Sequence, residues 1–227
     1  MEFTSGNYRK NAKKINYNIK LHKSSCGNTS PCSCEPINKV DHFKYLGVII
    51  DSNLKWTQHL NHIYKTMLPM LPLSYNLKCI MNKTTLKTVY HALIESRFSY
   101  GIIFWGASYK SHAKTLIKLI TKIQTILGIE NDVLDLNDLF FKRSCLFFFK
   151  RNSFKEEIVQ SKLRNLNIIP IKPNLELIKQ QCIYTKYKLF NSLPKSLKII
   201  DTLPKFKRLL CDYIDVSNTV ILNTYKT

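Results

Sequence analysis

Apolar residues recur at helical spacing over most of the chain after Trp56. The first run extends from Trp56 to Leu71, and a second begins near Asn82 or Thr84. A third covers residues 111–127 and has one clearly apolar face. That face consists of Leu116, Leu119, Ile120, Ile123 and Leu127. Recurrence at every third or fourth position is typical of helices that bury one side, so this part of the chain is predicted to be helical.

The pattern continues towards the C-terminus with interruptions. Pro69 and Pro72 are expected to kink or split the end of the first helix. Residues 132–164 are expected to form one or two helices, and residues 165–173 an extended segment. Further helices are expected over residues 175–190 and, as a short one, over residues 206–213, with a turn between them at residues 191–194.

The N-terminal part has a different pattern. Residues 1–41 are polar, basic and irregular, with one short strand expected from Asn18 to His22 and a loop from Ser24 to Pro36. Residues 43–50 are dense in aromatic and β-branched residues, which favours one strand. Asp51-Ser52-Asn53 should end that strand in a turn.

These patterns together predict a mainly α fold: a helical bundle with a short N-terminal β element. Of the 227 residues, 44% are hydrophobic and 22% charged, which is ordinary for a folded protein. Only 6 Gly and 8 Pro occur, which argues against a turn-rich all-β fold. We divide the chain into an N-terminal β region (1–52), a helical domain (53–130), a C-terminal helical region (131–216) and a tail (217–227).

The charge balance indicates a polyanionic partner. Lys and Arg total 35 against 15 Asp and Glu, a formal net charge of +20. Such a field attracts nucleic acid and supports phosphate contacts. A membrane is the weaker alternative, because no segment approaches the ~20 apolar residues needed to span one. The alternative explanation for the positive charge is a codon bias that favours Lys, although such a bias would not by itself deplete acidic residues.

Lysines spaced four apart on the third predicted helix form the first candidate binding surface. Like charges at this spacing repel each other, a cost that a phosphate backbone would offset; a merely solvated face is the competing interpretation. The candidates on this helix are Lys110, Lys114, Lys118 and Lys122, and those behind them are Lys142, Arg143, Lys150 and Arg151.

The cysteines give little support for a metal site. No secretory signal precedes the seven cysteines, so we expect reduced thiols and a cytoplasmic or nuclear, non-secreted protein. Cys26, Cys32, Cys34 and His42 form a cluster that zinc could use. The spacing C-x₅-C-x-C is poor for it, because residues one apart on an extended chain point in different directions. No metal or other cofactor is expected in this chain.

Two further groups have simple structural explanations. Acidic residues precede or begin a predicted helix, where they complement the helix dipole, so a nuclease-like metal site is not favoured. Three aromatic residues near position 100 could stack on bases, yet such a cluster is more often core. The acidic residues are Glu130, Asp132, Asp135 and Asp138, and the aromatic residues are Tyr100, Phe104 and Trp105.

Several motifs in order resemble non-LTR, jockey-like retrotransposon reverse transcriptases. The stretch FKYLGVIIDSNLKW at residues 43–56, followed by His59, resembles the strand that closes the palm beside the primer grip and leads into the thumb. Residues 86–90 (LKTVY), 99–101 (SYG) and 105–106 (WG) are similar to the family's thumb, and Gln124 to a position in its next helix. Residues 189–198 with Phe206-Lys207 resemble its terminal segment, with Phe190 where the family has Trp.

The resemblance implies an RNA-directed DNA polymerase, of which this chain would be the primer-grip and thumb region. Tyr45, Leu46 and Gly47 would form the primer-grip-like strand and shape the site near the primer terminus. The family's polymerising metals, Mg²⁺ in an intact enzyme, are held by carboxylates of an Asp-Asp turn and another Asp upstream. No Asp-Asp pair occurs here, so no catalytic residues are assigned and the chain alone is not expected to polymerise.

The partner that this resemblance implies is an RNA–DNA hybrid or RNA template-primer, together with a missing palm and fingers segment. No membrane partner is expected. Two alternatives remain open: a non-functional transposon relic, and a domesticated nucleic-acid-binding or interaction module.

Overall fold

The computed structural model describes residues 19–22, 26, 34–108, 110–150, 188–189, 191–200 and 202–216. These residues are 66% helical, with a two-stranded antiparallel sheet near the N-terminus. The predicted mainly α fold with a short β element is therefore confirmed. The chain forms two compact units, a hairpin unit (residues 1–58) and a helical unit (residues 59–227). The finer division into a helical domain and a separate region from residue 131 stays a prediction.

The sheet of the hairpin unit corrects one predicted element. Residues 43–50 do not form a single strand: β1 (His42–Tyr45) turns back into β2 (Val48–Asp51), with Tyr45 paired to Val48 and His42 to Asp51. Leu46 and Gly47 occupy the turn with φ of 46° and 84°. Two consecutive positive φ angles match the twist of a tight hairpin. Leu46 and Gly47 are thus turn residues, and only Tyr45 of the predicted primer-grip-like strand lies in a strand.

After β2 the chain forms a turn that the Asp51 side chain stabilises. Its carboxylate accepts backbone hydrogen bonds from Lys55 (3.2 Å) and Trp56 (3.0 Å). Leu54 and Trp56 both have positive φ, a conformation that is costly for large side chains and needs such support. Asp51 therefore stabilises the turn that the sequence predicts at residues 51–53.

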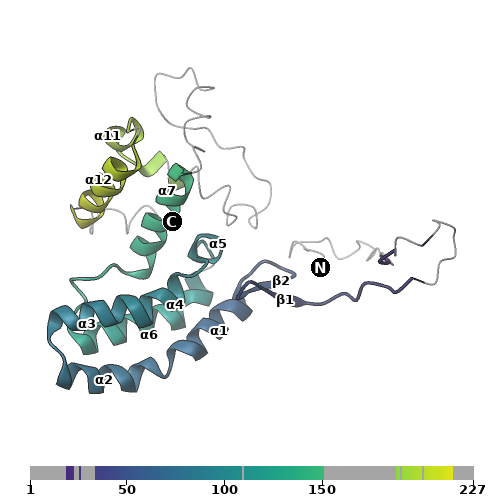
Figure 1. Cartoon of the computed structure of the whole chain (residues 1–227), viewed down its shortest axis with the longest axis horizontal. Helices are drawn as coiled ribbons and strands as arrows, with labels where there is room; N and C mark the ends of the chain where they lie inside the picture. Colours follow the sequence, from purple (N-terminus) through teal and green to yellow (C-terminus); the bar gives the residue numbers. More distant parts are fainter. Residues whose placement is uncertain are drawn as a thin grey trace. The chain divides into compact units, whose positions relative to one another are not determined.

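Helices account for almost all of the described part of the helical unit (Figure 1). They are α1 (Thr57–Met67, which starts two residues before the unit boundary), α2 (Met70–Ile80), α3 (Lys83–Val89), η1 (Tyr90–Glu95), α4 (Ser96–Ser99), α5 (Ile102–Trp105), α6 (Lys110–Leu127), α7 (Leu136–Lys150), α11 (Lys195–Lys198) and α12 (Leu203–Val216). Helix α2 packs along α6, and α7 packs against both α5 and α12.

Local sequence explains where several helices begin. Pro69 separates α1 from α2, as its missing N–H predicts. Asn82 caps α3, because its side chain accepts a hydrogen bond from the Thr85 N–H at 2.9 Å. Gly101 takes the left-handed conformation, φ 64°, and ends the long helix begun at Lys83. The aromatic stretch after residue 98 is therefore a helix end, a turn and the short helix α5.

The middle of that long helix is a π-helix, η1. Here the hydrogen bonds skip one more residue than in an α-helix, which is rare and shifts every following side chain around the axis. Tyr90 and Ile94 of η1 and Phe98 of α4 are all fully or nearly fully buried. The wider turn thus keeps these three side chains pointing into the protein.

The predicted apolar face of α6 is confirmed, because all five of its residues are buried. The buried side of the unit also takes large side chains from α1, η1, α4 and α5. A second apolar cluster joins α7 to α12 and includes Leu189, Leu193 and Leu197, which precede α12 in the chain. The rings of Phe149 and Phe206 stack in this cluster with their centroids 4.1 Å apart. Its buried members are Phe141, Cys145, Phe148, Leu189, Leu193, Leu197, Phe206, Leu210 and Ile214.

Some predicted elements lie outside the described residues. They are the extended segment 165–173, most of the helix at 175–190, and Phe190. The short helix predicted at 206–213 is present and longer, because α12 spans Leu203–Val216.

Candidate nucleic-acid interface

The lysine row lies on the side of α6 opposite its buried face. Lys114, Lys118 and Lys122 are all exposed, and none forms an ion pair with a described residue. Lys110 is the first residue of α6, and its side chain lies outside the described residues. The three lysines extend over two turns, so the helix presents a linear array of positive charge about 12 Å long.

Two lysines of α3, in contrast, form ion pairs with an acidic residue of the same chain. Lys83 and Lys87 on α3 reach the Asp132 carboxylate at 2.6 and 2.8 Å. These bonds, from Lys83 first and then Lys87, hold the pKa of Asp132 below its usual value. The two lysines of α3 therefore share one carboxylate within the chain, whereas α6 has no acidic residue at all.

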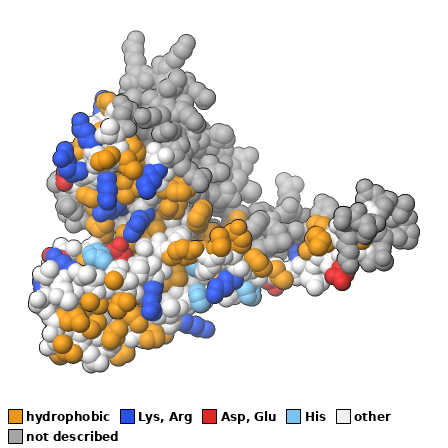
Figure 2. Space-filling view, viewed as in Figure 1, with side chains coloured by type: hydrophobic (Ala, Val, Ile, Leu, Met, Phe, Trp, Pro, Cys, Tyr) orange, Lys and Arg blue, Asp and Glu red, His pale blue; other side chains and the backbone are white. Residues whose placement is uncertain are grey.

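The predicted residues of α7 occupy a different surface. Lys142, Arg143 and Lys150 line a groove of about 790 Å³ between η1, the segment before α7, α7 and α12. Lys207 of α12 lines the same groove. It was not predicted as a site residue, because the hydrophobic pattern of the sequence does not indicate that α12 lies beside α7. Arg151 lies outside the described residues. Figure 2 shows Lys and Arg side chains over α7 and α12.

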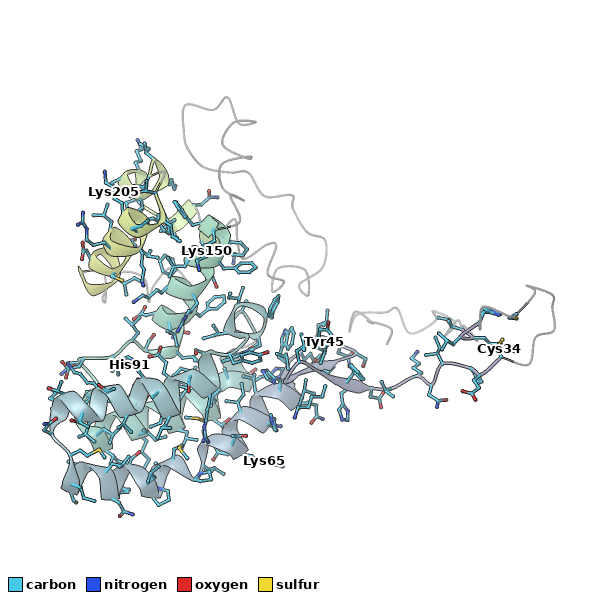
Figure 3. The ribbon with its side chains drawn as sticks, viewed as in Figure 1. Cys34, Tyr45, Lys65, His91, Lys150 and Lys205 are labelled. Atoms are coloured by element: carbon cyan, nitrogen blue, oxygen red, sulfur yellow. The ribbon has the colours of Figure 1, made fainter. Side chains whose placement is uncertain are left out.

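Two acidic residues, Glu95 and Asp132, line this groove and reduce its positive charge. Glu95 of η1 accepts from His91 Nδ1 at 2.6 Å and lies 3.7 Å from an Arg143 nitrogen. Glu95 and these two partners also line a neighbouring cavity of about 390 Å³ that extends to Tyr100. His91 and Lys150, labelled in Figure 3, thus mark a groove of mixed charge rather than a purely basic one.

The three aromatic residues near position 100 fall into two classes. Trp105 is completely buried; its indole N–H donates to the Tyr100 carbonyl at 3.0 Å, and its ring meets His59 edge-on at 6.0 Å. Burial, with His62 nearby, lowers the pKa of His59 to about 4. Tyr100 and Phe104 are about half exposed, so these two have the accessibility that base stacking requires.

The acidic residues do not gather into a catalytic site. Asp132 pairs with the α3 lysines, and Asp135 caps α7 by accepting from the Asp138 N–H at 2.7 Å. Asp138 is buried, which together with Asp135 raises the pKa of its carboxyl to about 6. Asp135 thus has the predicted role at a helix start, and among the described residues none of these carboxylates belongs to a group of potential metal ligands.

Motif residues distant in sequence meet inside the helical unit. The Gln124 amide donates to the Tyr90 hydroxyl at 2.8 Å and to the Leu134 carbonyl at 3.3 Å, joining α6 to η1 and to the segment before α7. Burial raises the pKa of Tyr90. Gly106 lies against Phe140 so closely that any side chain would collide with its ring. These motif residues hold the fold together rather than face a ligand.

One group of potential metal ligands was predicted only in part. His22, Cys26 and Cys34 place one ligand atom each within 4.8 Å of one another. The sequence pattern grouped the cysteines with His42 instead. His42 is exposed on β1 and does not belong to this group. Cys32 lies outside the described residues. Spacing could not reveal His22, because its approach to Cys34 depends on the pairing of the segments around Lys20 and Pro36.

Comparison with known proteins gives a loose relationship. The sequence is 25% identical over 95 residues to the probable RNA-directed DNA polymerase from transposon X-element of Drosophila melanogaster. The matched segment covers 40% of this chain and 10% of that protein, so the chain spans only a small part of its relative. No family model and no solved structure matches. In the described residues, no helix is both long and apolar enough to cross a bilayer. The chain is therefore similar to part of a transposon reverse transcriptase.

Proposed function

We propose that this chain is a C-terminal fragment of a retrotransposon reverse transcriptase whose helical, thumb-like part holds template–primer nucleic acid. The observation that carries the proposal is the exposed lysine row of α6: Lys114, Lys118 and Lys122 have no ion-pair partner among the described residues. The relationship to the X-element polymerase supports the same class of ligand. The protein would act in the cytoplasm or nucleus, where such a template–primer is found.

The row suits the phosphate backbone rather than the bases. Lysine ammonium groups are mobile point charges that neutralise phosphates without reading sequence. Binding should therefore tolerate any sequence and weaken steeply with salt, because each neutralised phosphate releases counterions. The groove of α7 and α12 would add weaker contacts through Lys142, Lys150 and Lys207, since Glu95 already engages the neighbouring Arg143.

The hairpin unit supports the proposal of a missing palm and fingers segment. Phe43, Tyr45 and Leu46 each expose more than half of their surface, and a cluster of exposed large apolar residues commonly marks an interaction surface. No polymerisation is assigned to this chain alone, because the carboxylates that the reaction needs would come from that segment.

Fluorescence anisotropy with a labelled RNA–DNA hybrid, titrated from low to high salt, tests the proposal. The variant Lys114→Gln/Lys118→Gln/Lys122→Gln should bind more weakly, with the slope of log affinity against log salt reduced by about 2 to 3. The matched control replaces three exposed lysines on three other helices, Lys65, Lys78 and Lys205, and removes the same total charge. It should change the slope by less than 1.

Three other results would overturn the proposal. Equal losses in the two variants would mean that only net charge matters. A folded, monodisperse protein without salt-sensitive binding would indicate a relic. Binding confined to one sequence or one protein partner would indicate a domesticated module.

A further inference from the structure

The two paired segments of the hairpin unit that precede β1 bring three zinc-ligating side chains together. Residues 19–21 and 35–37 run antiparallel: the Leu21 N–H donates to the Glu35 carbonyl at 3.1 Å, and the Ile37 N–H to the Ile19 carbonyl at 2.8 Å. Lys20 pairs with Pro36 in this register. The next position on the same face pairs His22 with Cys34. Residues directly opposite in an antiparallel pair have Cβ atoms about 5 Å apart, which explains why these two side chains meet.

Cys26, which lies between the two segments in the sequence, completes the group. Its sulfur lies 3.4 Å from His22 Nδ1, and the three ligand atoms all lie within 4.8 Å of one another. Tetrahedral zinc with bonds of about 2.1 Å to nitrogen and 2.3 Å to sulfur holds its ligands roughly 3.5 to 3.8 Å apart. The His22–Cys26 distance already suits such a site, and the other separations need to close by at most about 1 Å.

Burial shows why this unit would benefit from a metal. Among its described residues none is classed as buried, and Ile19, Leu21 and Ile37 beside the group are each more than half exposed. A pair of short strands without a core is marginal in water, and small units of this kind are commonly stabilised by a metal or a disulfide. All three ligand residues are accessible, because His22 is exposed and the two cysteines are half-buried.

We propose that His22, Cys26 and Cys34 bind one Zn²⁺ ion that links the two paired segments to Cys26. One imidazole and two thiolates form a ligand set that zinc prefers over Mg²⁺ or Ca²⁺, which take oxygen ligands. Three protein ligands leave the fourth tetrahedral position to a water molecule. Binding deprotonates the thiols, so about two protons leave per ion. The ion would link the paired segments, and the site does not depend on the proposed binding of nucleic acid.

Cobalt titration of the full-length, reduced protein tests this site. One Co²⁺ per chain should bind with intense thiolate-to-cobalt absorption, and Zn²⁺ should displace it. His22→Ala, Cys26→Ser and Cys34→Ser should each weaken binding at least tenfold. Cys79→Ser, which removes an exposed thiol from α2, is the matched control and should bind like the wild type. Far-ultraviolet circular dichroism should show the same helix content in all four variants, so that a loss of binding reports the site.

Two outcomes would overturn the proposal. One is a wild-type protein that binds no Co²⁺ more tightly than the Cys26→Ser variant does. The other is a loss of binding in Cys79→Ser equal to that in Cys34→Ser, because the ion would then be held by exposed thiols in general. Hybrid binding measured on the same samples keeps the two proposals apart: the zinc-site variants should retain the affinity and salt slope of the wild type.

Discussion

The helical unit buries its aromatic residues, whereas the hairpin unit exposes them. Tyr90, Phe98 and Trp105 are completely buried, while Phe43 and Tyr45 expose more than half of their surface. Tyr90 and Trp105 in the first set, and Phe43 and Tyr45 in the second, lie in the motifs on which the predicted resemblance rests. The difference therefore separates two uses of a motif: in the helical unit it builds a core, and in the hairpin unit it leaves an apolar surface for which the described residues provide no cover.

A similar contrast exists within the helical unit, between α6 and α2. The buried face of α6 is continuous and its opposite face is charged, whereas α2 is apolar on several sides but buries only Ser74. Tyr75 and Ile80 of α2 are exposed, and Figure 2 shows apolar side chains over this helix. Apolar content alone thus does not decide burial in this protein; periodicity does.

Among the substitutions considered, removal of the Trp105 side chain should change the free energy of unfolding most. Trp105→Ala deletes a fully buried ring together with its hydrogen bond to the Tyr100 carbonyl. We expect the free energy of unfolding to fall by about 3 to 5 kcal/mol, measured by chemical denaturation with circular dichroism. The control is Phe104→Ala in the same short helix, whose half-exposed ring should cost less than about 1 kcal/mol. Equal losses would show that α5 does not anchor the core.

The hydrogen bond between Gln124 and Tyr90 should have the next largest effect. Gln124→Leu should destabilise the protein by roughly 1 to 3 kcal/mol, because the Tyr90 hydroxyl and the Leu134 carbonyl lose a buried donor. Adding Tyr90→Phe removes one of these stranded groups, so the double variant should lose less than the sum of the two single variants. Strict additivity, measured by urea denaturation, would contradict a direct bond between η1 and α6.

Periodicity allowed most of the helical unit to be predicted. The start at Asn82, the split at Pro69 and the buried face of α6 follow from short-range rules, since capping, proline and the helical repeat act within a few residues. The π-helix η1 was not predictable, because its wider turn depends on packing and leaves no spacing signal. The hairpin was missed because Leu46, a residue that rarely takes positive φ, lies in the turn with Gly47.

The candidate sites show the same division. Exposure of the α6 lysines follows from the apolar stripe opposite them, so it was predictable from sequence. The inclusion of Lys207 in the groove and of His22 beside the two cysteines depends on which segments pair in space. Single-sequence spacing has no access to that information.

A buried acid gives a smaller, pH-dependent effect. The pKa of Asp138 is raised to about 6 in the folded protein from 3.8 when unfolded, so the folded state binds more protons between these values. Stability from this group is full below pH 4 and is lost as the pH rises through 6. Asp138→Asn should therefore match the wild type near pH 3.5 and be more stable by roughly 2 kcal/mol above pH 6.5, after discounting for partial solvation.

Melting temperatures measured across this range, as the difference between variant and wild type, isolate Asp138. The difference is needed because His59 also titrates in this range: its pKa is lowered to about 4, so its contribution to the stability of the folded protein is lost as the pH falls through the same window. The control is Asp41→Asn, which removes an exposed carboxylate from the hairpin unit. A flat difference for Asp138→Asn would mean that its carboxyl is solvated in solution.

The smallest expected effect is on the hairpin unit. Phe43→Ser should change the free energy of unfolding by less than about 0.5 kcal/mol, because the ring is already more than half exposed before unfolding. The same substitution at the fully buried Phe98 should cost several kcal/mol. If Phe43→Ser instead destabilises the protein as Phe98→Ser does, the hairpin is covered in solution. A change in self-association by sedimentation velocity without a change in stability would identify Phe43 as part of a contact surface, the role that a missing palm segment requires.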